Sequence, residues 1–232
     1  MKNAIQLNDI VVEVTQKKIK NIHLSVYPSG QVKLSAPLHM NQDTIRVFLI
    51  SKLSWIKQKQ KKFATQQRET PRDCIDRESH YVWGKRYLLK IIEHDERPKI
   101  SLGHSELLLT VRPKTSAAQK QAIMDEWLRE ELKKALPPLI AKWEPVMGVQ
   151  VKKFFVQKMK TRWGSCNYTK ANVRFNSELA KKPIECLEYV VVHELVHLLE
   201  PSHNARFHRL MTQFLPHWKL IKDELNRLPI AV

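Results

Sequence analysis

The N-terminal part of the chain alternates apolar and polar residues over short stretches, as β-strands with one buried face do. This alternation covers residues 10–36 and is interrupted by a turn-like segment at 27–31. From residue 41 to about 64 the apolar positions recur every three or four residues, which predicts one helix with a broad buried face. Strand-like patterns return at 81–83, 87–92 and 106–111. We therefore expect a β-rich N-terminal domain over residues 1–113, with antiparallel sheet and one helix.

The second half is dominated by helical periodicity. A strong apolar stripe predicts a helix over 116–141, with a kink or a new helix start at Pro137 and Pro138. Strands are expected at 149–159 and 171–176. A further helix begins at Pro183, ends before Pro201, and is followed by one at 203–214 that Ser202 is placed to cap. The pattern as a whole predicts an α+β protein with a second domain over 114–232.

Composition excludes several classes of protein. The chain has 232 residues, of which 43% are hydrophobic and 27% charged, so it is able to form a packed core. No apolar run approaches the roughly 18 residues needed to cross a bilayer, and the first residues lack a signal-peptide pattern, so we expect a soluble cytoplasmic protein without a membrane partner. The three cysteines, Cys74, Cys166 and Cys186, have no spacing typical of a disulfide framework or a cysteine-ligated zinc site.

The positive charge is concentrated at the two ends of the chain. The net charge is +17, with +8 over residues 1–70, +2 over 71–150 and +7 over 151–232. Near the first end, Trp55 precedes the basic run 57–62. These features are compatible with nucleic-acid binding by the N-terminal region, although an ordinary solvated basic surface has the same composition.

The sequence His193-Glu194-Leu195-Val196-His197 carries the clearest chemistry. Histidines at positions i and i+4 lie on one face of a helix, where both rings can bind a single zinc ion. Glu194 follows the first ligand, and its carboxylate can act as general base toward a water molecule. This arrangement is typical of a zinc-dependent peptidase, with one Zn²⁺ per chain.

A catalytic zinc site needs a third protein ligand. The candidates are His203, His208, Glu200 and His217. We favour His203, because a turn after Pro201 can bring the chain back over the metal. His208 and Glu200 remain alternatives, whereas His217 is better explained as a surface residue.

An unusual turn-rich segment, 161–167, precedes the predicted metal helix. Gly164 is expected to supply either a positive φ or a close backbone approach. Arg162 is a candidate catalytic residue that stabilises the developing oxyanion or binds a carboxylate. A purely structural turn explains the segment equally well. Cys166 as a nucleophile would need a base, and His193 is occupied in the zinc interpretation.

The motifs together resemble the YgjP-like family of metal-dependent hydrolases, which are described as predicted zinc metallopeptidases. The resemblance rests on the segment 162–166, on Phe175, Asn176, Leu179 and Pro183, on the stretch 189–198, and on His203, Asn204 and Phe207. It implies a zincin-like domain in which His193, His197 and His203 bind the metal and Glu194 is the catalytic base. The family commonly has Trp after the Phe of the last motif, where this chain has His208.

The same C-terminal layout is more distantly similar to the SprT and Spartan proteases, which degrade proteins crosslinked to DNA. We therefore expect a zinc metallopeptidase that acts on a peptide or protein. The first alternative is a DNA-associated basic protein whose zinc site is structural or acts only on DNA-bound proteins. A hydrolase of non-peptide amides is the second alternative. The sequence makes no prediction of the oligomeric state.

Overall fold

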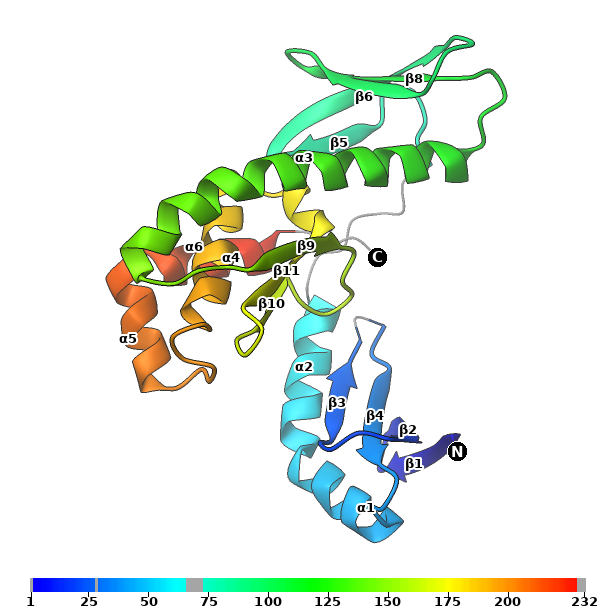
Figure 1. Cartoon of the computed structure of the whole chain (residues 1–232). Helices are drawn as coiled ribbons and strands as arrows, with labels where there is room; N and C mark the ends of the chain where they lie inside the picture. The colour runs from blue at the N-terminus through cyan, green and yellow to red at the C-terminus, as the bar shows by residue number, and fades with distance from the viewer. Residues whose placement is uncertain (1, 28, 66–72, 229–232) are drawn as a thin grey trace. The chain divides into compact units, whose positions relative to one another are not determined.

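The computed structural model describes residues 2–27, 29–65 and 73–228, which divide between two compact units (Figure 1). Unit 1 comprises Met1–Gln67 and unit 2 comprises Arg68–Val232. Each unit has a hydrophobic core of its own, drawn from residues 7–56 in unit 1 and from residues 74–225 in unit 2. The α+β class expected from the sequence is confirmed.

Unit 1 is a four-stranded sheet with two helices. Its strands are β1 (Lys2–Leu7), β2 (Ile10–Lys17), β3 (His23–Val26) and β4 (Val32–Pro37), in the order β1-β2-β4-β3. The helices are α1 (Gln42–Ser51) and α2 (Leu53–Thr65). The single helix predicted over 41–64 is thus divided at Lys52, whose backbone N–H caps α1 by donating to the carbonyls of Leu49 and Ile50. The inward faces of both helices cover the sheet with Ile45, Leu49 and Ile56.

Unit 2 begins with a second four-stranded sheet. Its strands are β5 (Ser79–Val82), β6 (Lys85–Glu93), β7 (Lys99–Leu102) and β8 (Glu106–Val111), in the order β5-β6-β8-β7. The order and the strand directions repeat those of unit 1, a similarity for which the sequence contains no visible repeat. Both sheets are mixed rather than antiparallel throughout, because β2 pairs with β4, and β6 with β8, in parallel.

The boundary between the compact units differs from the one expected at residue 113. The sheet β5–β8 belongs with the helices of unit 2, because its apolar residues Leu89, Leu107 and Leu109 join one core with Leu132 and Leu136 of α3 (Ala117–Met147). Alternation in sequence predicts a strand, whereas the element that covers its apolar face is set by tertiary packing.

Helix α3 is continuous through three prolines, Pro137, Pro138 and Pro145, so no new helix begins at the first pair. Figure 1 shows its axis bending along its length, as expected where proline removes a backbone donor. Ser116 and Gln119 form a capping box at its start, and Gly148 ends it in a left-handed conformation, with φ of 65°. None of the helices that the structure describes has the length and apolarity needed to cross a membrane.

The remainder of unit 2 is a small sheet flanked by helices. Strands β9 (Lys153–Gln157), β10 (Gly164–Asn167) and β11 (Asn172–Asn176) lie in the order β10-β11-β9. They are followed by a 3-10 helix η1 (Ser177–Lys181), α4 (Ile184–Val196), α5 (Ala205–Phe214) and α6 (Trp218–Arg227). Helix α5 is capped by Asn204, whose side chain accepts from the Phe207 N–H, and not by Ser202. Helix α6 was not expected, although Trp218, Ile221 and Leu225 have helical spacing.

Candidate metal centre and active-site cleft

Three histidine rings meet at the end of helix α4. His193 and His197 lie one turn apart, with ring centroids 5.0 Å from each other. The loop after α4 brings in His203, whose ring centroid lies 5.0 Å from that of His193 and 4.6 Å from that of His197. The Nε2 atoms of His203 and His193 are 3.1 Å apart, and one ring nitrogen from each of the three residues lies within 4.8 Å of the others. The three rings therefore converge on a common point.

The rings are held in place by a buried phenylalanine. Phe207, on α5, is 1% exposed, and its centroid lies 5.0, 4.8 and 4.7 Å from the rings of His193, His197 and His203. The Nδ1 atom of His197 is 3.2 Å from the Glu200 carbonyl oxygen. Because a carbonyl only accepts, Nδ1 carries the proton and Nε2 keeps a free lone pair. The Nδ1 atom of His193 is buried without a hydrogen-bond partner among the described residues, so packing orients that ring.

The environment keeps these histidines neutral. The pKa of His193 is lowered to about 3, mainly by burial and then by its neighbours His197 and His203. Burial also lowers the pKa of His197 and of His203, and for His203 the His197 ring adds to the effect. A neutral imidazole is the form that binds a metal ion, so protons compete weakly for this cluster at neutral pH.

Glu194 is buried beside the histidines, with 5% of its surface exposed. Burial raises its pKa to about 8, and the charge of Arg162 opposes that shift. Its carboxylate lies against the backbone of β10. A Cβ atom at Gly164 would stand 2.6 Å from Oε1, 2.8 Å from Cγ and 2.9 Å from Cδ of Glu194. Gly164 does not have a positive φ, so close approach of the carboxylate, and not backbone conformation, accounts for the glycine.

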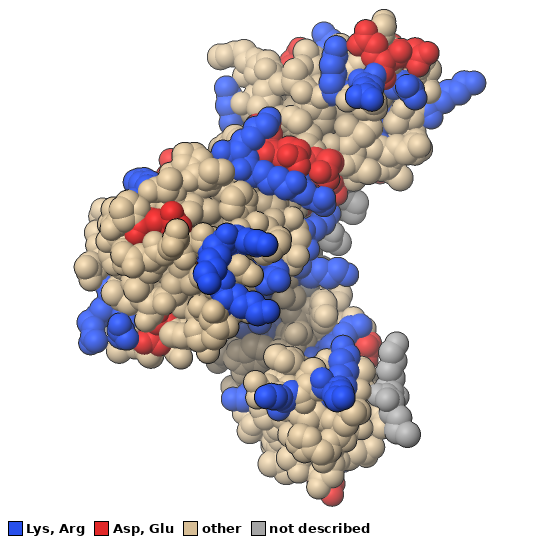
Figure 2. Space-filling model, in the orientation of Figure 1, with Lys and Arg blue, Asp and Glu red and all other residues tan. Residues whose placement is uncertain are grey.

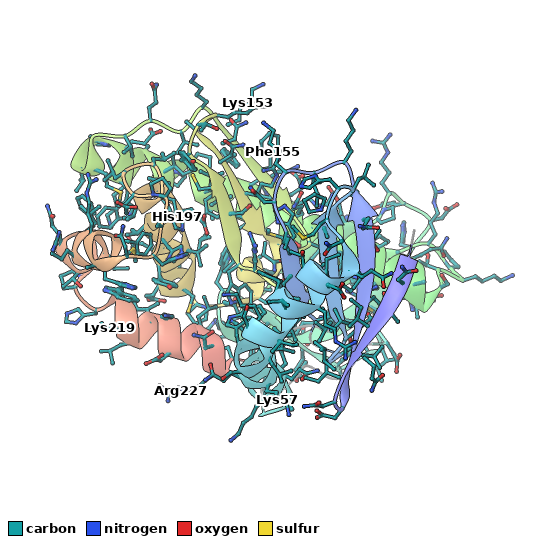
Figure 3. The ribbon with its side chains drawn as sticks, turned by 90° about the horizontal axis from the view of Figure 1, so that it is seen from below. Lys57, Lys153, Phe155, His197, Lys219 and Arg227 are labelled. Atoms are coloured by element: carbon teal, nitrogen blue, oxygen red, sulfur yellow. The ribbon has the colours of Figure 1, made fainter. Side chains whose placement is uncertain are left out.

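The cluster opens into a cleft of about 550 Å³ between α4 and β10. The residues of 162–166 form one side, and Tyr189, His193, Glu194 and His197 form the other. Strand β10 is an edge strand of the small sheet. Strand β9, whose Lys153 and Phe155 are labelled in Figure 3, is the other edge strand of this sheet. His197 lies on the side of unit 2 that is formed by helices (Figure 3). The cleft therefore combines the histidine cluster, a buried carboxyl group and a sheet edge.

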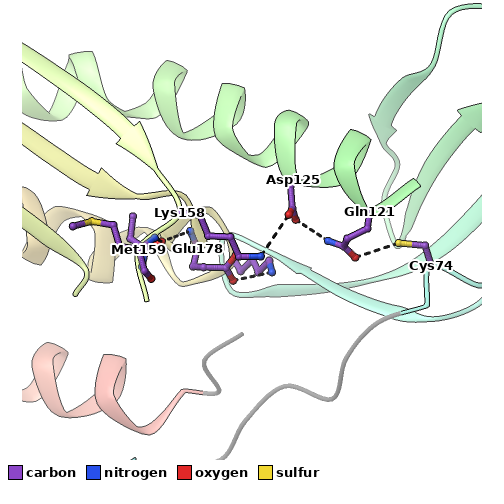
Figure 4. A network of polar contacts seen from close by, with 8 residues as sticks. Cys74, Gln121, Asp125, Lys158, Met159 and Glu178 are labelled. Carbon is purple, nitrogen blue, oxygen red and sulfur yellow. Dashed lines mark hydrogen bonds and ion pairs between the residues drawn. The ribbon is translucent and has the colours of Figure 1, made fainter. Parts of the chain in front are cut away.

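The segment that carries Arg162 is tied down by Asn176 at the end of β11. The Asn176 side-chain amide donates to the carbonyls of Met159 (2.8 Å) and Arg162 (2.9 Å), and its oxygen accepts from the Met159 N–H (3.2 Å). Lys158, which directly precedes Met159, forms an ion pair of 3.5 Å with Asp125 of α3. Figure 4 shows how these contacts continue from Asp125 through Gln121 to Cys74.

The structure separates the alternative third ligands from the cluster. His208 is exposed and stacks on Trp218, with centroids 5.6 Å apart. Glu200 accepts from the Ser202 N–H at 3.1 Å and lies 3.7 Å from the guanidinium of Arg206. His217 is exposed immediately before α6. Of the four candidates, the geometry brings only His203 into the cluster of ring nitrogens among the described residues.

The cysteines are free thiols. Cys166 does line the cleft, but burial, followed by the charge of Glu194, raises its pKa to about 11. The thiol therefore remains protonated at neutral pH, which disfavours its use as a nucleophile.

Two tyrosines of the cleft were not among the candidates from the sequence. Tyr189 lies four residues before His193, and that spacing alone places it on the same helix face. Its pKa is raised, mainly by burial, so the phenol stays protonated. Tyr168, in the turn between β10 and β11, is 54% exposed and has no such sequence signal.

Comparison with known protein families matches residues 20–228 to the YgjP-like metallopeptidase domain. The chain belongs to the YgjP-like family. No curated protein matches this YgjP-like chain. Among solved structures, the metallopeptidase zymogen of Pyrococcus abyssi abylysin is similar, with 20% sequence identity and a TM-score of 0.36 over 40% of this chain and 97% of that one. The family is one of metallopeptidases, and thus of metal-dependent hydrolases whose substrates are peptides or proteins. The more distant similarity to SprT and Spartan has no support in these comparisons.

Proposed function

We propose that this YgjP-like protein is a zinc-dependent peptidase in which His193, His197 and His203 bind the metal and Glu194 is the catalytic base. The observation that carries the proposal is the convergence of three neutral histidines beside a buried carboxyl group in an open cleft. The membership of a metallopeptidase family supports the same activity.

The donor set fits zinc. Zinc is commonly bound by imidazole nitrogens at about 2.0–2.1 Å, and two such ligands in a tetrahedral site lie about 3.3 Å apart. The Nε2 atoms of His193 and His203 are 3.1 Å apart. The hydrogen bond between the His197 Nδ1 and the Glu200 carbonyl orients that ring, as partners of metal-binding histidines commonly do. Three protein ligands and an open cleft favour a catalytic site over a structural one, which is usually closed by four.

When bound, zinc supplies Lewis-acid chemistry, by lowering the pKa of water and polarising a carbonyl group. Glu194 takes the proton from the attacking water and returns it to the leaving amine, so the same carboxyl group serves as base and then as acid. In the metal-free chain, burial raises the pKa of Glu194 to about 8, so this carboxyl group holds a proton more readily than an exposed glutamate and is suited to return it to the leaving amine. Arg162 is exposed at the cleft and has the charge needed to stabilise the developing oxyanion or to bind a substrate carboxylate.

The sheet edge at the cleft suits an extended peptide. Strand β10 pairs with β11 on one side, and the sheet ends on its other side. An edge strand can accept a peptide as an additional strand through main-chain hydrogen bonds. A small non-peptide amide would leave these groups unused, so the geometry favours a peptide or protein over the alternative amide substrates.

Metal content and turnover test the proposal together. We expect about one zinc per purified chain, lost in His193→Ala and in His203→Ala and retained in Glu194→Gln. His208→Ala is the matched control, because that ring stacks on Trp218 outside the cluster. Glu194→Gln should abolish hydrolysis of an unstructured protein such as casein. Zinc retained in His203→Ala, or hydrolysis retained in Glu194→Gln, would contradict the assignment.

A further inference from the structure

A second concave surface lies within unit 1, where α1 turns into α2 beside β3. It is a groove of about 450 Å³ lined by Leu24, Phe48, Ser51, Lys52, Ser54, Trp55 and Gln58. Strand β3 is an edge strand of its sheet, so the groove lies at a margin of unit 1. None of its lining residues belongs to the candidate metal centre, and the peptidase proposal does not use this surface.

The groove presents aromatic rings with cations beside them. Trp55 is 39% exposed, which is unusual for the largest apolar side chain in a small unit. The Lys59 ammonium lies 5.8 Å from the Trp55 ring centroid, and the Lys52 ammonium lies 6.0 Å from that of Phe48. Neither lysine forms an ion pair with any residue that the structure describes. The groove thus has a flat apolar surface and positive charge within one small area.

Unit 1 as a whole adds to the positive charge around the groove. The unit has eleven lysines and arginines and three acidic residues, a net charge of +8. Two of the acidic groups are already engaged, since Asp9 pairs with Lys57 at 3.3 Å and Glu13 pairs with Lys33 at 3.0 Å. The third, Asp43, lies in the first turn of α1, at the end of the helix opposite to Lys52. On the face of this unit seen in Figure 2, blue basic side chains far exceed red acidic ones.

We propose that the groove binds single-stranded nucleic acid, with a base stacked on Trp55 and phosphates contacted by Lys52 and Lys59. Sequence-tolerant binding of single strands characteristically combines an aromatic stacking platform with a cationic path for the backbone. Each nucleotide carries one planar ring system and one phosphate. This matches the two pairs of ring and ammonium group at the groove, Phe48 with Lys52 inside it and Trp55 with the adjoining Lys59.

Other partners fit less well. Duplex nucleic acid presents mainly phosphates at its surface and keeps its bases stacked inside, so the exposed Trp55 ring would remain unused. An acidic peptide would satisfy the lysines but would offer no regular supply of flat rings. A peptide that only fills an apolar groove would leave the two ammonium groups without a counter-charge.

Fluorescence anisotropy of a labelled oligothymidylate on the full chain, at several salt concentrations, tests the proposal. Stacking is worth about 1–3 kcal/mol per base, so Trp55→Ala should weaken binding about 5- to 150-fold. The double variant Lys52→Gln/Lys59→Gln should make the slope of log affinity against log salt shallower by about 1.4, at about 0.7 per lost phosphate contact on a single strand. The assay requires no turnover, so a failed peptidase test would leave this result interpretable, and the reverse also holds.

Matched controls are available in unit 2. Tyr81 is also 39% exposed, and Tyr81→Ala should leave binding unchanged. Lys85→Gln/Lys114→Gln removes the same two charges from exposed positions outside the groove and should preserve the salt slope. Equal loss in Tyr81→Ala and Trp55→Ala would overturn the proposal. So would full competition by polyglutamate of matched length, tighter binding of duplex than of single strand, or the absence of binding.

Discussion

The contact between Gly164 and Glu194 makes a sharp prediction about the replacement Gly164→Ala. The new Cβ would lie 2.6 Å from the Glu194 Oε1, whereas ordinary contacts begin at about 3.4 Å. The carboxylate or the β10 backbone must therefore move by about 0.5–0.8 Å, the difference between 3.4 Å and the three contacts at 2.6–2.9 Å. Because Glu194 is 5% exposed, the side chain has little free space in which to relax.

A displacement approaching 1 Å at a catalytic group can reduce the rate about a hundredfold. We expect Gly164→Ala to lower kcat by about 10- to 100-fold, with a smaller change in KM and zinc content retained. Overpacking should also destabilise the fold by about 1–3 kcal/mol. Gly103→Ala is the matched control, because its Cβ would meet only the Glu106 carbonyl oxygen at 3.4 Å, and its backbone conformation is also compatible with alanine.

Steady-state hydrolysis of a peptide substrate, zinc content and chemical denaturation measure these effects separately. A wild-type kcat in Gly164→Ala would refute the reasoning. Loss of zinc in that variant would instead show that the whole cluster had moved.

Three further predictions concern the metal-free and metal-bound chain. Because the pKa of Glu194 is raised to about 8 from 4.5, the folded metal-free chain keeps a proton that the unfolded chain releases between those pH values, and the carboxyl group makes the free energy of unfolding fall as pH rises through this window. Glu194→Gln should remove this pH-dependent loss of stability. In urea denaturation, the free energy of unfolding of the variant should exceed that of the wild type by an amount that grows toward pH 8, on the order of a few kcal/mol. Parallel pH profiles of the two proteins would exclude this effect of Glu194. Phe207→Ala should cost about 3–5 kcal/mol of stability and weaken zinc binding, since the ring packs against all three histidines, whereas His203→Ala should lose zinc with little change in metal-free stability. Removing zinc with a chelator should lower the Tm, and added zinc should restore it. Zinc at a thousandfold excess over Kd should raise the free energy of unfolding by about 4 kcal/mol. A Tm unaffected by the chelator would argue against a resident metal.

Much of the secondary structure follows from local patterns. Strands β2–β6 and β8 and the helices α3 and α4 lie where apolar periodicity places them, because a buried face imposes that periodicity directly on neighbouring residues. The strands β1 and β7 were not predicted. Features that depend on contacts between distant segments were not predicted from the sequence. The parallel pairing of β6 with β8 and the attachment of their sheet to α3 depend on contacts between distant segments.

The candidate site likewise has features that the sequence predicts and features that depend on tertiary packing. The sequence by itself determined that His193 and His197 share a helix face with Glu194 between them, because the geometry of one helical turn is a local property. Only the tertiary structure decided that the loop after Pro201 turns His203, and not His208, toward those rings. It also decided that Gly164, distant in sequence, would leave the space that the Glu194 carboxylate fills. Residue types and spacing specify which side chains are able to do chemistry, but packing determines which of them meet.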